Sequence, residues 1–143
     1  MRCEEIMKAG VQCCRPEDTV MDAAVRMRDN NVGFLPICDE DGKVKGVVTD
    51  RDIVLRCVAE DLPYDTRVED CMSSDEIVFC RPQDDLKRAQ QLMGAKQKSR
   101  ILVCDDSGRL VGVISLSDIA QFEDGSTAAN TMRRVSERET RTH

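Results

Sequence analysis

Two short polar stretches follow apolar, strand-like segments and could bind a phosphorylated sugar. "GVVTDRDI" and "GVISLSDI" each place a hydroxyl residue three positions before an aspartate. This spacing makes a capping box, in which the hydroxyl and the acid accept backbone N–H groups at a helix start. A helix start also favours phosphate, and a carboxylate fixed there could accept both hydroxyls of a ribose. The two pairs are Thr49 with Asp52 and Ser115 with Asp118.

The first stretch contains an arginine that the second lacks. Arg51 lies between Thr49 and Asp52, and its planar guanidinium is suited to phosphate oxygens. Ser117 takes the equivalent place in the second stretch. A helix cap alone and a cap that also binds a ligand predict the same local fold, so both interpretations stay open at this point.

The two stretches belong to a long internal repeat. Residues 14–53 align with residues 80–119 without a gap, and 13 of the 40 positions are identical. Two copies of this length indicate a duplicated subdomain and not a solenoid. The predicted boundaries are residues 1–61 for the first copy, 62–70 for a linker, 71–123 for the second copy and 124–143 for a polar tail.

Each copy predicts the order strand, helix, strand, strand, helix. The segments "GVQCC" and "EIVFC" predict first strands, and Asp18 and Asp84 are expected to cap helices of about 12 residues. Two hairpins with glycine turns follow, and the last helices extend to about Glu60 and Glu123. The fold class is α/β, of the α+β type. The copies are expected to pack sheet to sheet about a pseudo-twofold axis.

Composition excludes several classes of protein. The net charge of -6 and the 3% aromatic content argue against nucleic-acid binding. The sequence has no apolar run long enough to span a membrane and no signal peptide, so we expect a cytoplasmic protein. The polar tail is expected to be disordered, with a partner-docking helix at about residues 128–138 as the alternative.

The eight cysteines are expected to be reduced, and most of them to be buried as small apolar side chains. They form no CxxC pair, and the only histidine is His143, so no metal site is predicted. If the first strand lies parallel to its neighbour, Cys13 or Cys14 approaches Cys38 within reach of a disulfide. A redox-responsive bridge at that place is a further hypothesis.

No enzyme motif is present. The body of the chain has no histidine that could act as a general base and no GxxxxGK[ST] phosphate loop. Carboxylate pairs occur in turns and at caps, so acid–base catalysis is the one enzymatic alternative that stays open. Because the other catalytic motifs are missing from the sequence, we predict that the protein is not an enzyme.

The repeat resembles a tandem pair of CBS domains, the Bateman module, which is named after cystathionine beta-synthase. The resemblance covers residues 4 to about 122 and rests on elements that occur in both copies. These are the "IM" or "CM" start, the proline before the first helix, "LPIC" or "ILVC" followed by Asp, the glycine turn and the motif G-h-h-[ST]-x-x-D-h, where h is apolar. The sequence further resembles small stand-alone bacterial CBS-pair proteins, some of them associated with stress or hypoxic responses.

The resemblance implies that AMP, ADP, ATP or S-adenosylmethionine binds in the cleft between the copies. It assigns Thr49 and Asp52 to one site, and Ser115 and Asp118 to the other, with each aspartate on the ribose hydroxyls. Asp50 is expected to pair with Arg51 and to favour AMP over ATP. The backbone expected to frame the base comes from Val11, Gln12, Ile77 and Val78.

Lys98 and Arg100 begin a strand of the second copy and could reach a phosphate held across the axis; the alternative is a solvated strand edge. The leading hypothesis is a non-catalytic regulatory module that needs no cofactor, forms a homodimer and signals to an unknown effector protein. The rival is a CBS-fold structural or thiol-redox interaction protein that binds no nucleotide.

Overall fold

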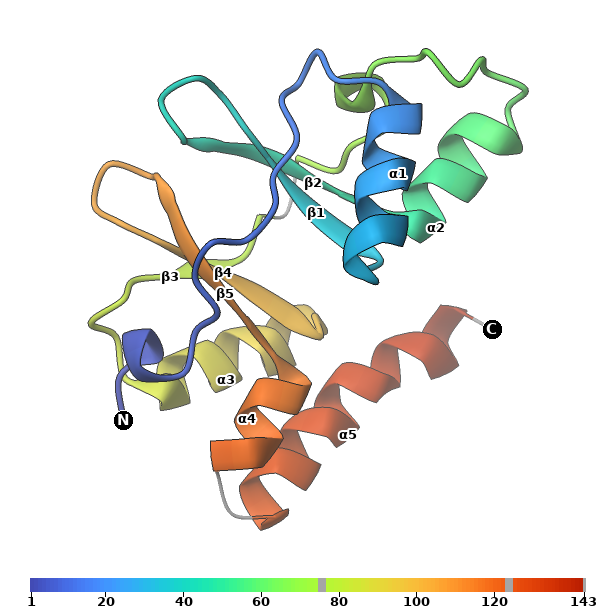
Figure 1. Ribbon diagram of the computed structural model, residues 1–143. Helices are drawn as coiled ribbons and strands as arrows, with labels where there is room; N and C mark the ends of the chain where they lie inside the picture. Colours follow the sequence, from blue (N-terminus) through green and yellow to red (C-terminus); the bar gives the residue numbers. More distant parts are fainter. Residues whose placement is uncertain (75–76, 123–124, 143) are drawn as a thin grey trace. The chain divides into compact units, whose positions relative to one another are not determined.

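A computed structural model describes residues 1–74, 77–122 and 125–142 (Figure 1). The chain forms two compact units. The first-copy unit comprises Gln12–Ile77, and the second-copy unit combines Met1–Val11 with the chain from Val78 onward. Each unit contains one small sheet together with helices, so the predicted mixed α and β architecture is confirmed.

The first-copy unit is built on an antiparallel hairpin. β1 and β2 are joined by a turn in which Gly42 has a φ of 83°, a conformation that favours glycine. The helical end of this copy changes from α-helix to a π-helical turn, η2, directly after α2. The elements are α1 (Val20–Asn30), β1 (Phe34–Cys38), β2 (Val44–Thr49), α2 (Asp50–Ile53), η2 (Val54–Val58) and the 3₁₀ turn η3 (Val68–Asp70).

The second-copy unit repeats this plan with one more strand and one more helix. Its sheet has the order β3-β4-β5, with β3 parallel to β4 and β4 antiparallel to β5. The elements are the 3₁₀ turn η1 (Cys3–Glu5), β3 (Phe79–Cys80), α3 (Leu86–Lys96), β4 (Arg100–Cys104), β5 (Leu110–Ser115), α4 (Leu116–Phe122) and α5 (Gly125–Thr142).

The prediction of a regular strand at "GVQCC" is wrong. Only Cys14 bridges to Ile37, where the Cys14 N–H donates to the Pro36 carbonyl and the Cys38 N–H donates to the Cys14 carbonyl, each at 2.9 Å. The next bond of a parallel ladder would need a backbone N–H at Pro36, which proline lacks. In the second copy Leu102 replaces this proline, and its N–H donates to the Val78 carbonyl at 3.2 Å.

The predicted helix caps lie one residue too early. Thr19, not Asp18, caps α1, and it forms a capping box with Asp22. The Asp18 carboxylate instead accepts the N–H of Arg15 at 2.9 Å and braces the turn before the helix. The second copy has the same shift: Asp85 caps α3 by accepting the Lys87 N–H, and Asp84 accepts the Arg81 N–H.

The packing units differ from the sequence repeats at their N-terminal segments. Residues 1–11 pack on the second copy, where Lys8 pairs with Val113. The related "EDCM" segment, followed by Ser73, packs on the first copy, where Ser73 pairs with Val47. Each segment packs closely against a glycine that has no side chain to block it. A Cβ at Gly112 would lie 2.7 Å from the Met7 sulfur, and a Cβ at Gly46 would lie 2.8 Å from the Met72 sulfur.

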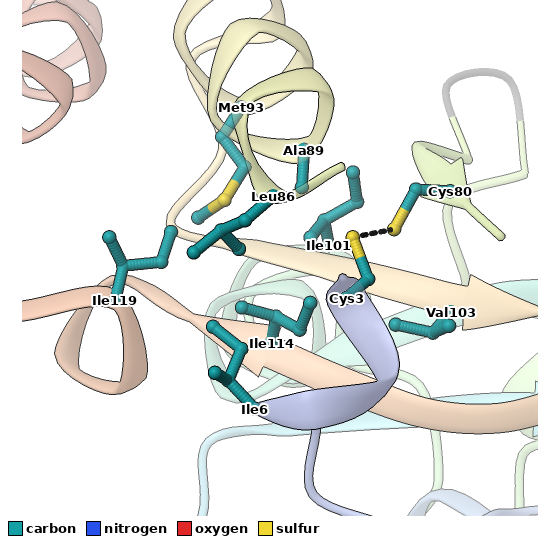
Figure 2. Packing of buried hydrophobic residues seen from close by; sticks show 10 residues of the cluster. All are labelled: Cys3, Ile6, Cys80, Leu86, Ala89, Met93, Ile101, Val103, Ile114 and Ile119. Atoms are coloured by element: carbon teal, nitrogen blue, oxygen red, sulfur yellow. Dashed lines mark hydrogen bonds between the residues drawn. The ribbon is translucent and has the colours of Figure 1, made fainter. Parts of the chain in front are cut away.

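Both cores are aliphatic, as the scarcity of aromatic residues predicts. Seven of the eight cysteines are buried, and Cys13 is half-buried. Figure 2 shows the second-copy core, formed by Cys3, Ile6, Cys80, Leu86, Ala89, Met93, Ile101, Val103, Ile114 and Ile119. The first-copy core contains Cys14, Ala23, Met27, Leu35, Ile37, Val48 and Val68.

The polar tail forms a helix, so the expectation of disorder is wrong for its described part. α5 is longer than the alternative helix at residues 128–138, and it packs on α3 and α4 of its own unit (Figure 1). Thr131 and Val135 are buried, whereas Met132 is 51% exposed. None of the helices described combines the length and the apolar character needed to cross a bilayer.

Candidate functional site

The first candidate site lies where β2 ends and α2 begins. The Asp52 N–H donates to Thr49 Oγ1, and the Thr49 N–H donates to Asp52 Oδ2, each at 3.0 Å. The predicted capping box is therefore confirmed. It occupies one carboxylate oxygen, and Asp52 Oδ1 lies 3.9 Å from the Nε atom of Arg56.

The second candidate site has the same geometry at the end of β5. The Asp118 N–H donates to Ser115 Oγ at 3.2 Å, and the Ser115 N–H donates to Asp118 Oδ2 at 2.9 Å. The Ser115 and Ser117 hydroxyls are hydrogen-bonded to each other at 2.8 Å. Asp118 is only 5% exposed, so its carboxylate is more enclosed than that of Asp52.

Sequence reasoning missed Lys8 at the second site. Its ammonium lies 3.4 Å from Asp118 Oδ1, while most of its side chain is exposed. Lys8 reaches this position because residues 1–11 pack on the second copy. No local motif could have revealed the contact, because Lys8 and Asp118 lie far apart in the sequence. The repeat could not reveal it either, because the position equivalent to Lys8 in the other copy is Ser73.

Strand pairing places Arg100 at the second site. Arg100 is opposite Ser115 in the β4–β5 register, and the Leu116 N–H donates to the Ser99 carbonyl at 3.0 Å. Lys98 is half-buried in the loop before β4, where its N–H donates to the Met93 carbonyl at 2.9 Å. Arg100 is thus tied to the Ser115 site of its own copy by backbone register.

Arg51 presents an exposed guanidinium beside the first site. Asp50 does not form the expected side-chain ion pair with it; its Oδ1 accepts the backbone N–H of Arg51 at 2.9 Å. The Asp50 carboxylate also covers Gly33, where a Cβ would lie 2.7 Å from Asp50 Oδ2. The guanidinium forms no ion pair within the described ranges, and it can approach a ligand.

The residues expected to frame the base lie where the chain passes between units. One passage separates Val11 from Gln12, and the other separates Ile77 from Val78. The Val78 carbonyl already accepts the Leu102 N–H. The contribution of these four residues to base binding stays a prediction.

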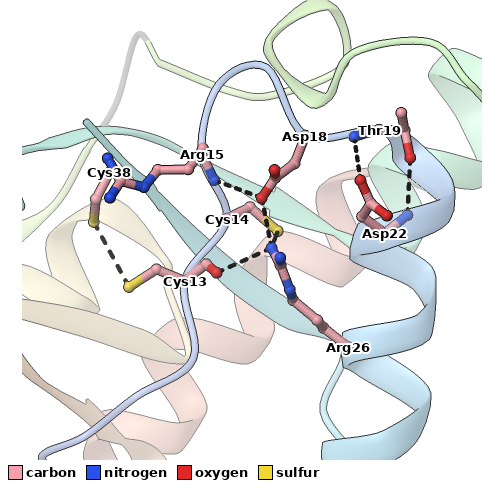
Figure 3. Close-up of polar contacts among 8 residues, drawn as sticks. All are labelled: Cys13, Cys14, Arg15, Asp18, Thr19, Asp22, Arg26 and Cys38. Carbon is pink, nitrogen blue, oxygen red and sulfur yellow. Dashed lines mark hydrogen bonds and ion pairs between the residues drawn. The ribbon is translucent and has the colours of Figure 1, made fainter. Parts of the chain in front are cut away.

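The structure brings Cys13 and Cys38 together and keeps Cys14 apart (Figure 3). The Cys38 thiol donates to Cys13 Sγ at 3.7 Å. Cys14 is buried in the core, and its sulfur accepts from Arg26 Nη1 at 3.2 Å. Of the two cysteines considered as partners for Cys38, Cys13 is therefore the one with suitable geometry.

Charge and hydrogen bonding make Cys13 the more acidic thiol. The Cys38 thiol, followed by the positive charges of Arg26 and Arg15, lowers the pKa of Cys13 to about 7 even though burial opposes this change. Burial raises the pKa of Cys14, which outweighs its contact with Arg26. Arg26 is itself fixed by Asp18 at 2.6 Å (Figure 3). Cys13 is thus set up to ionise near neutral pH.

The side chains of the described part of the chain include no group of three or more His, Cys, Asp or Glu residues that could hold a metal ion. The two candidate sites each combine a carboxylate, a hydroxyl and a nearby cation. This combination suits the binding of a polyhydroxyl anion.

Comparison with known proteins finds the CBS domain twice in the chain, at residues 3–58 and 68–125. The uncharacterized protein YlbB of Bacillus subtilis is 35% identical over 129 residues, which is 90% of this chain and 86% of the relative. Hypoxic response protein 1 of Mycobacterium tuberculosis is 34% identical over 117 residues, 82% of this chain and 81% of the relative.

Solved structures share the fold and confirm the predicted tandem pair. Hypoxic Response Protein I with two coordinated zinc ions has a TM-score of 0.78 and 30% identity, over 87% of this chain and 100% of its own. A Pyrobaculum aerophilum CBS domain protein complexed with AMP has a TM-score of 0.77 and 24% identity, over 93% and 99%. The CBS domain pair of MJ0100 with 5'-methylthioadenosine and S-adenosyl-L-methionine has a TM-score of 0.74 and 24% identity, over 85% and 94%.

Cys13 should react with iodoacetamide with a midpoint near pH 7, because the thiolate is the reactive form and its fraction rises as pH rises through the pKa. Cys38→Ala should move this midpoint upward toward the ordinary value of about 8.5. Tandem mass spectrometry separates the modification of Cys13 from that of Cys14.

Cys104 is the internal reference for this titration, because burial raises its pKa to about 11 and it should stay unmodified at neutral pH. Arg26→Gln should shift the Cys13 midpoint less than Cys38→Ala does, since the Cys38 contact is the larger cause. An unchanged midpoint in Cys38→Ala would contradict the assignment.

Proposed function

Since this chain belongs to the CBS domain family, we propose that it is a non-catalytic regulatory module that binds an adenosine-containing ligand. The proposed sites are the two pairs Thr49–Asp52 and Ser115–Asp118. The proposed module forms a homodimer and signals to an effector protein in the cytoplasm. A stress or hypoxic role is suggested by the relative named hypoxic response protein 1.

The observation that carries the proposal is that the two carboxylate oxygens of each aspartate have different partners. Oδ2 accepts the cap N–H in both copies. Oδ1 is not needed by the cap and lies near a cation, Arg56 in the first copy and Lys8 in the second. An ionised Oδ1 can accept the two O–H donors of a ribose without breaking the helix cap. The helix cap and the ligand site are thus compatible in one residue.

A phosphate has a separate partner at each proposed site. Arg51 offers an exposed guanidinium next to Thr49. The second copy has Ser117 at that position, but Arg100 lies opposite Ser115 on the neighbouring strand. Guanidinium groups bind phosphate oxygens in a planar, bidentate manner. The proposed ligand is therefore a nucleotide, and Lys98, in the loop before β4, is a second candidate for its phosphate.

The proposed ligands are AMP, ADP, ATP and S-adenosylmethionine. Proteins of this fold have been crystallised with AMP and with S-adenosylmethionine, which supports an adenosine group as the common element. The Asp50 carboxylate next to Arg51 disfavours additional phosphates by charge repulsion, so AMP is the preferred candidate. For signalling, the ligand must bind one conformation of the module better than another.

Asp52→Asn and Asp118→Asn should each weaken nucleotide binding at their own site by roughly 10- to 100-fold, the loss of a hydrogen bond to a charged acceptor. Asparagine keeps the size of the side chain and can still accept the cap N–H, so the fold should persist. Isothermal titration calorimetry with AMP, ADP, ATP and S-adenosylmethionine measures the affinity.

Asp22→Asn is the matched control for these variants. Asp22 holds the same capping-box position with Thr19 at α1, a different helix from those that begin at the two proposed sites. This variant should bind like the wild type. Failure of the wild-type protein to bind any of the four ligands at millimolar concentration would contradict the nucleotide proposal. Unchanged affinity in both Asp52→Asn and Asp118→Asn would contradict only the site assignment.

Arg51→Gln should weaken AMP binding by about 10-fold and leave adenosine binding unchanged, because only AMP has a phosphate for the guanidinium. Arg109→Gln removes an exposed arginine from the β4–β5 turn of the second-copy unit and serves as the control. Equal losses for AMP and adenosine in Arg51→Gln would show that Arg51 acts on the fold and not on the phosphate.

A further inference from the structure

A second pair of cysteines lies in the core of the second-copy unit (Figure 2). The Cys80 thiol, on β3, donates to the sulfur of Cys3, on η1, at 3.5 Å. Cys3 is 0% and Cys80 is 2% exposed, so neither sulfur is in contact with bulk water. The repeat pattern did not reveal this pair, because Cys3 belongs to the segment that packs on the opposite copy.

We propose that Cys3 and Cys80 are an oxidation site at which a hydroperoxide forms a reversible disulfide. In the first step, the Cys3 thiolate attacks a peroxide oxygen, which gives the sulfenic acid of Cys3 and releases water or an alcohol after protonation. In the second step, the Cys80 sulfur attacks the Cys3 sulfur and displaces its hydroxyl as water. Two thiols are thereby oxidised, and the peroxide oxygen–oxygen bond is reduced.

The geometry supports bond formation with little backbone movement. The sulfurs must approach from 3.5 Å to the disulfide length of about 2.05 Å. Both backbones are anchored close to the sulfurs: the Cys3 N–H donates to the Asp84 carbonyl at 2.9 Å, and β3 is paired with β4. The pair thus needs a small rotation of side chains and no rearrangement of the sheet.

The order of the two steps follows from the hydrogen bond. The Cys80 thiol stabilises a thiolate at Cys3 and lowers the pKa of Cys3, although burial and the charges of Asp84 and Asp85 oppose this change. The same contact with Cys3, together with burial, raises the pKa of Cys80. Cys3 is therefore the attacking sulfur and Cys80 the resolving one.

The first copy provides a natural reference for this site. Cys3 corresponds in the repeat to Val68 and Cys80 corresponds to Cys14, and Val68 and Cys14 share one hydrophobic cluster. A valine therefore fits the position that Cys3 holds. Packing alone does not require a thiol there, and only the second copy can form the disulfide.

Access to the buried sulfurs requires local opening of the N-terminal segment. Backbone hydrogen bonds attach residues 1–8 to the rest of the unit at four places. The Met1 carbonyl accepts the Leu86 N–H, the N–H groups of Cys3 and Glu4 donate to the carbonyls of Asp84 and Pro82, and Lys8 and Val113 exchange two bonds. Segments at chain ends open more readily than the core. Hydrogen peroxide is small enough to reach Cys3 during such an opening, whereas a bulky disulfide reagent should react more slowly.

The disulfide would fix the segment that carries Lys8. It would connect residues 3 and 80 and so close a loop that contains the whole first-copy unit. Lys8, five residues after Cys3, would then be held next to Asp118. In the reduced protein the segment can detach and take Lys8 with it. Oxidation would thereby couple the redox state of the protein to the charge at the second candidate site.

Peptide mapping after treatment with hydrogen peroxide tests the proposal. The protein is reduced, oxidised, alkylated under denaturing conditions and digested with trypsin, which releases residues 3–8 and 68–87. We expect a cross-link between these two peptides that dithiothreitol removes. Because Cys71 lies in the same peptide as Cys80, the cross-link must persist in Cys71→Ala and disappear in Cys80→Ala.

Thermal unfolding gives a second readout. Oxidation should raise the Tm of the wild-type protein by roughly 5–15 °C more than that of Cys3→Val, which copies the first-copy core. Cys13 and Cys38 remain in both proteins, so the difference reports the Cys3 bridge alone. If Cys3 and Cys80 are still alkylated after peroxide treatment, or if the cross-link needs Cys71, the proposal is wrong. The peptide map of the oxidised wild-type protein tests the disulfide even if Cys3→Val fails to fold.

Discussion

The fold and the proposed site both depend on one pair of hydrogen bonds at each junction between a strand and a helix. A hydroxyl accepts the N–H of an aspartate three residues later, and the aspartate accepts the N–H of the hydroxyl residue. Without these bonds, half-buried backbone donors at the helix start would be left unpaired, at about 1–3 kcal/mol each. The same bonds fix the carboxylate so that its other oxygen can meet a ligand.

Much of the architecture could be predicted from the sequence, because the repeat reports the same pattern twice. The hairpins, the glycine turns and the capping boxes are local features with clear residue preferences. The first strand was overestimated, because its length depends on a hydrogen-bond donor that Pro36 lacks on the neighbouring strand. The placement of residues 1–11 could not be predicted, since two related segments can each pack over a glycine of either copy.

The two copies share a scaffold and differ in the charges around it. Arg51 is specific to the first copy, whereas Lys8 and Arg100 lie near Ser115 and Asp118 of the second. Lys8 arrives from a distant part of the sequence, so only the folded chain reveals its position. We therefore expect the two proposed sites to differ in affinity. The cysteines add a further asymmetry, because Cys3 and Cys80 meet only in the second copy.

The central claim is that Asp52 and Asp118, the aspartates at the two proposed sites, each bind a ribose diol. The most direct test compares the affinity of the wild-type protein for AMP with its affinity for 2',3'-dideoxy-AMP, which keeps the base and the phosphate. Two hydrogen bonds to a carboxylate predict a loss of roughly 10- to 1,000-fold for the dideoxy compound. Equal affinity for the two compounds would contradict the claim, whatever else the protein binds.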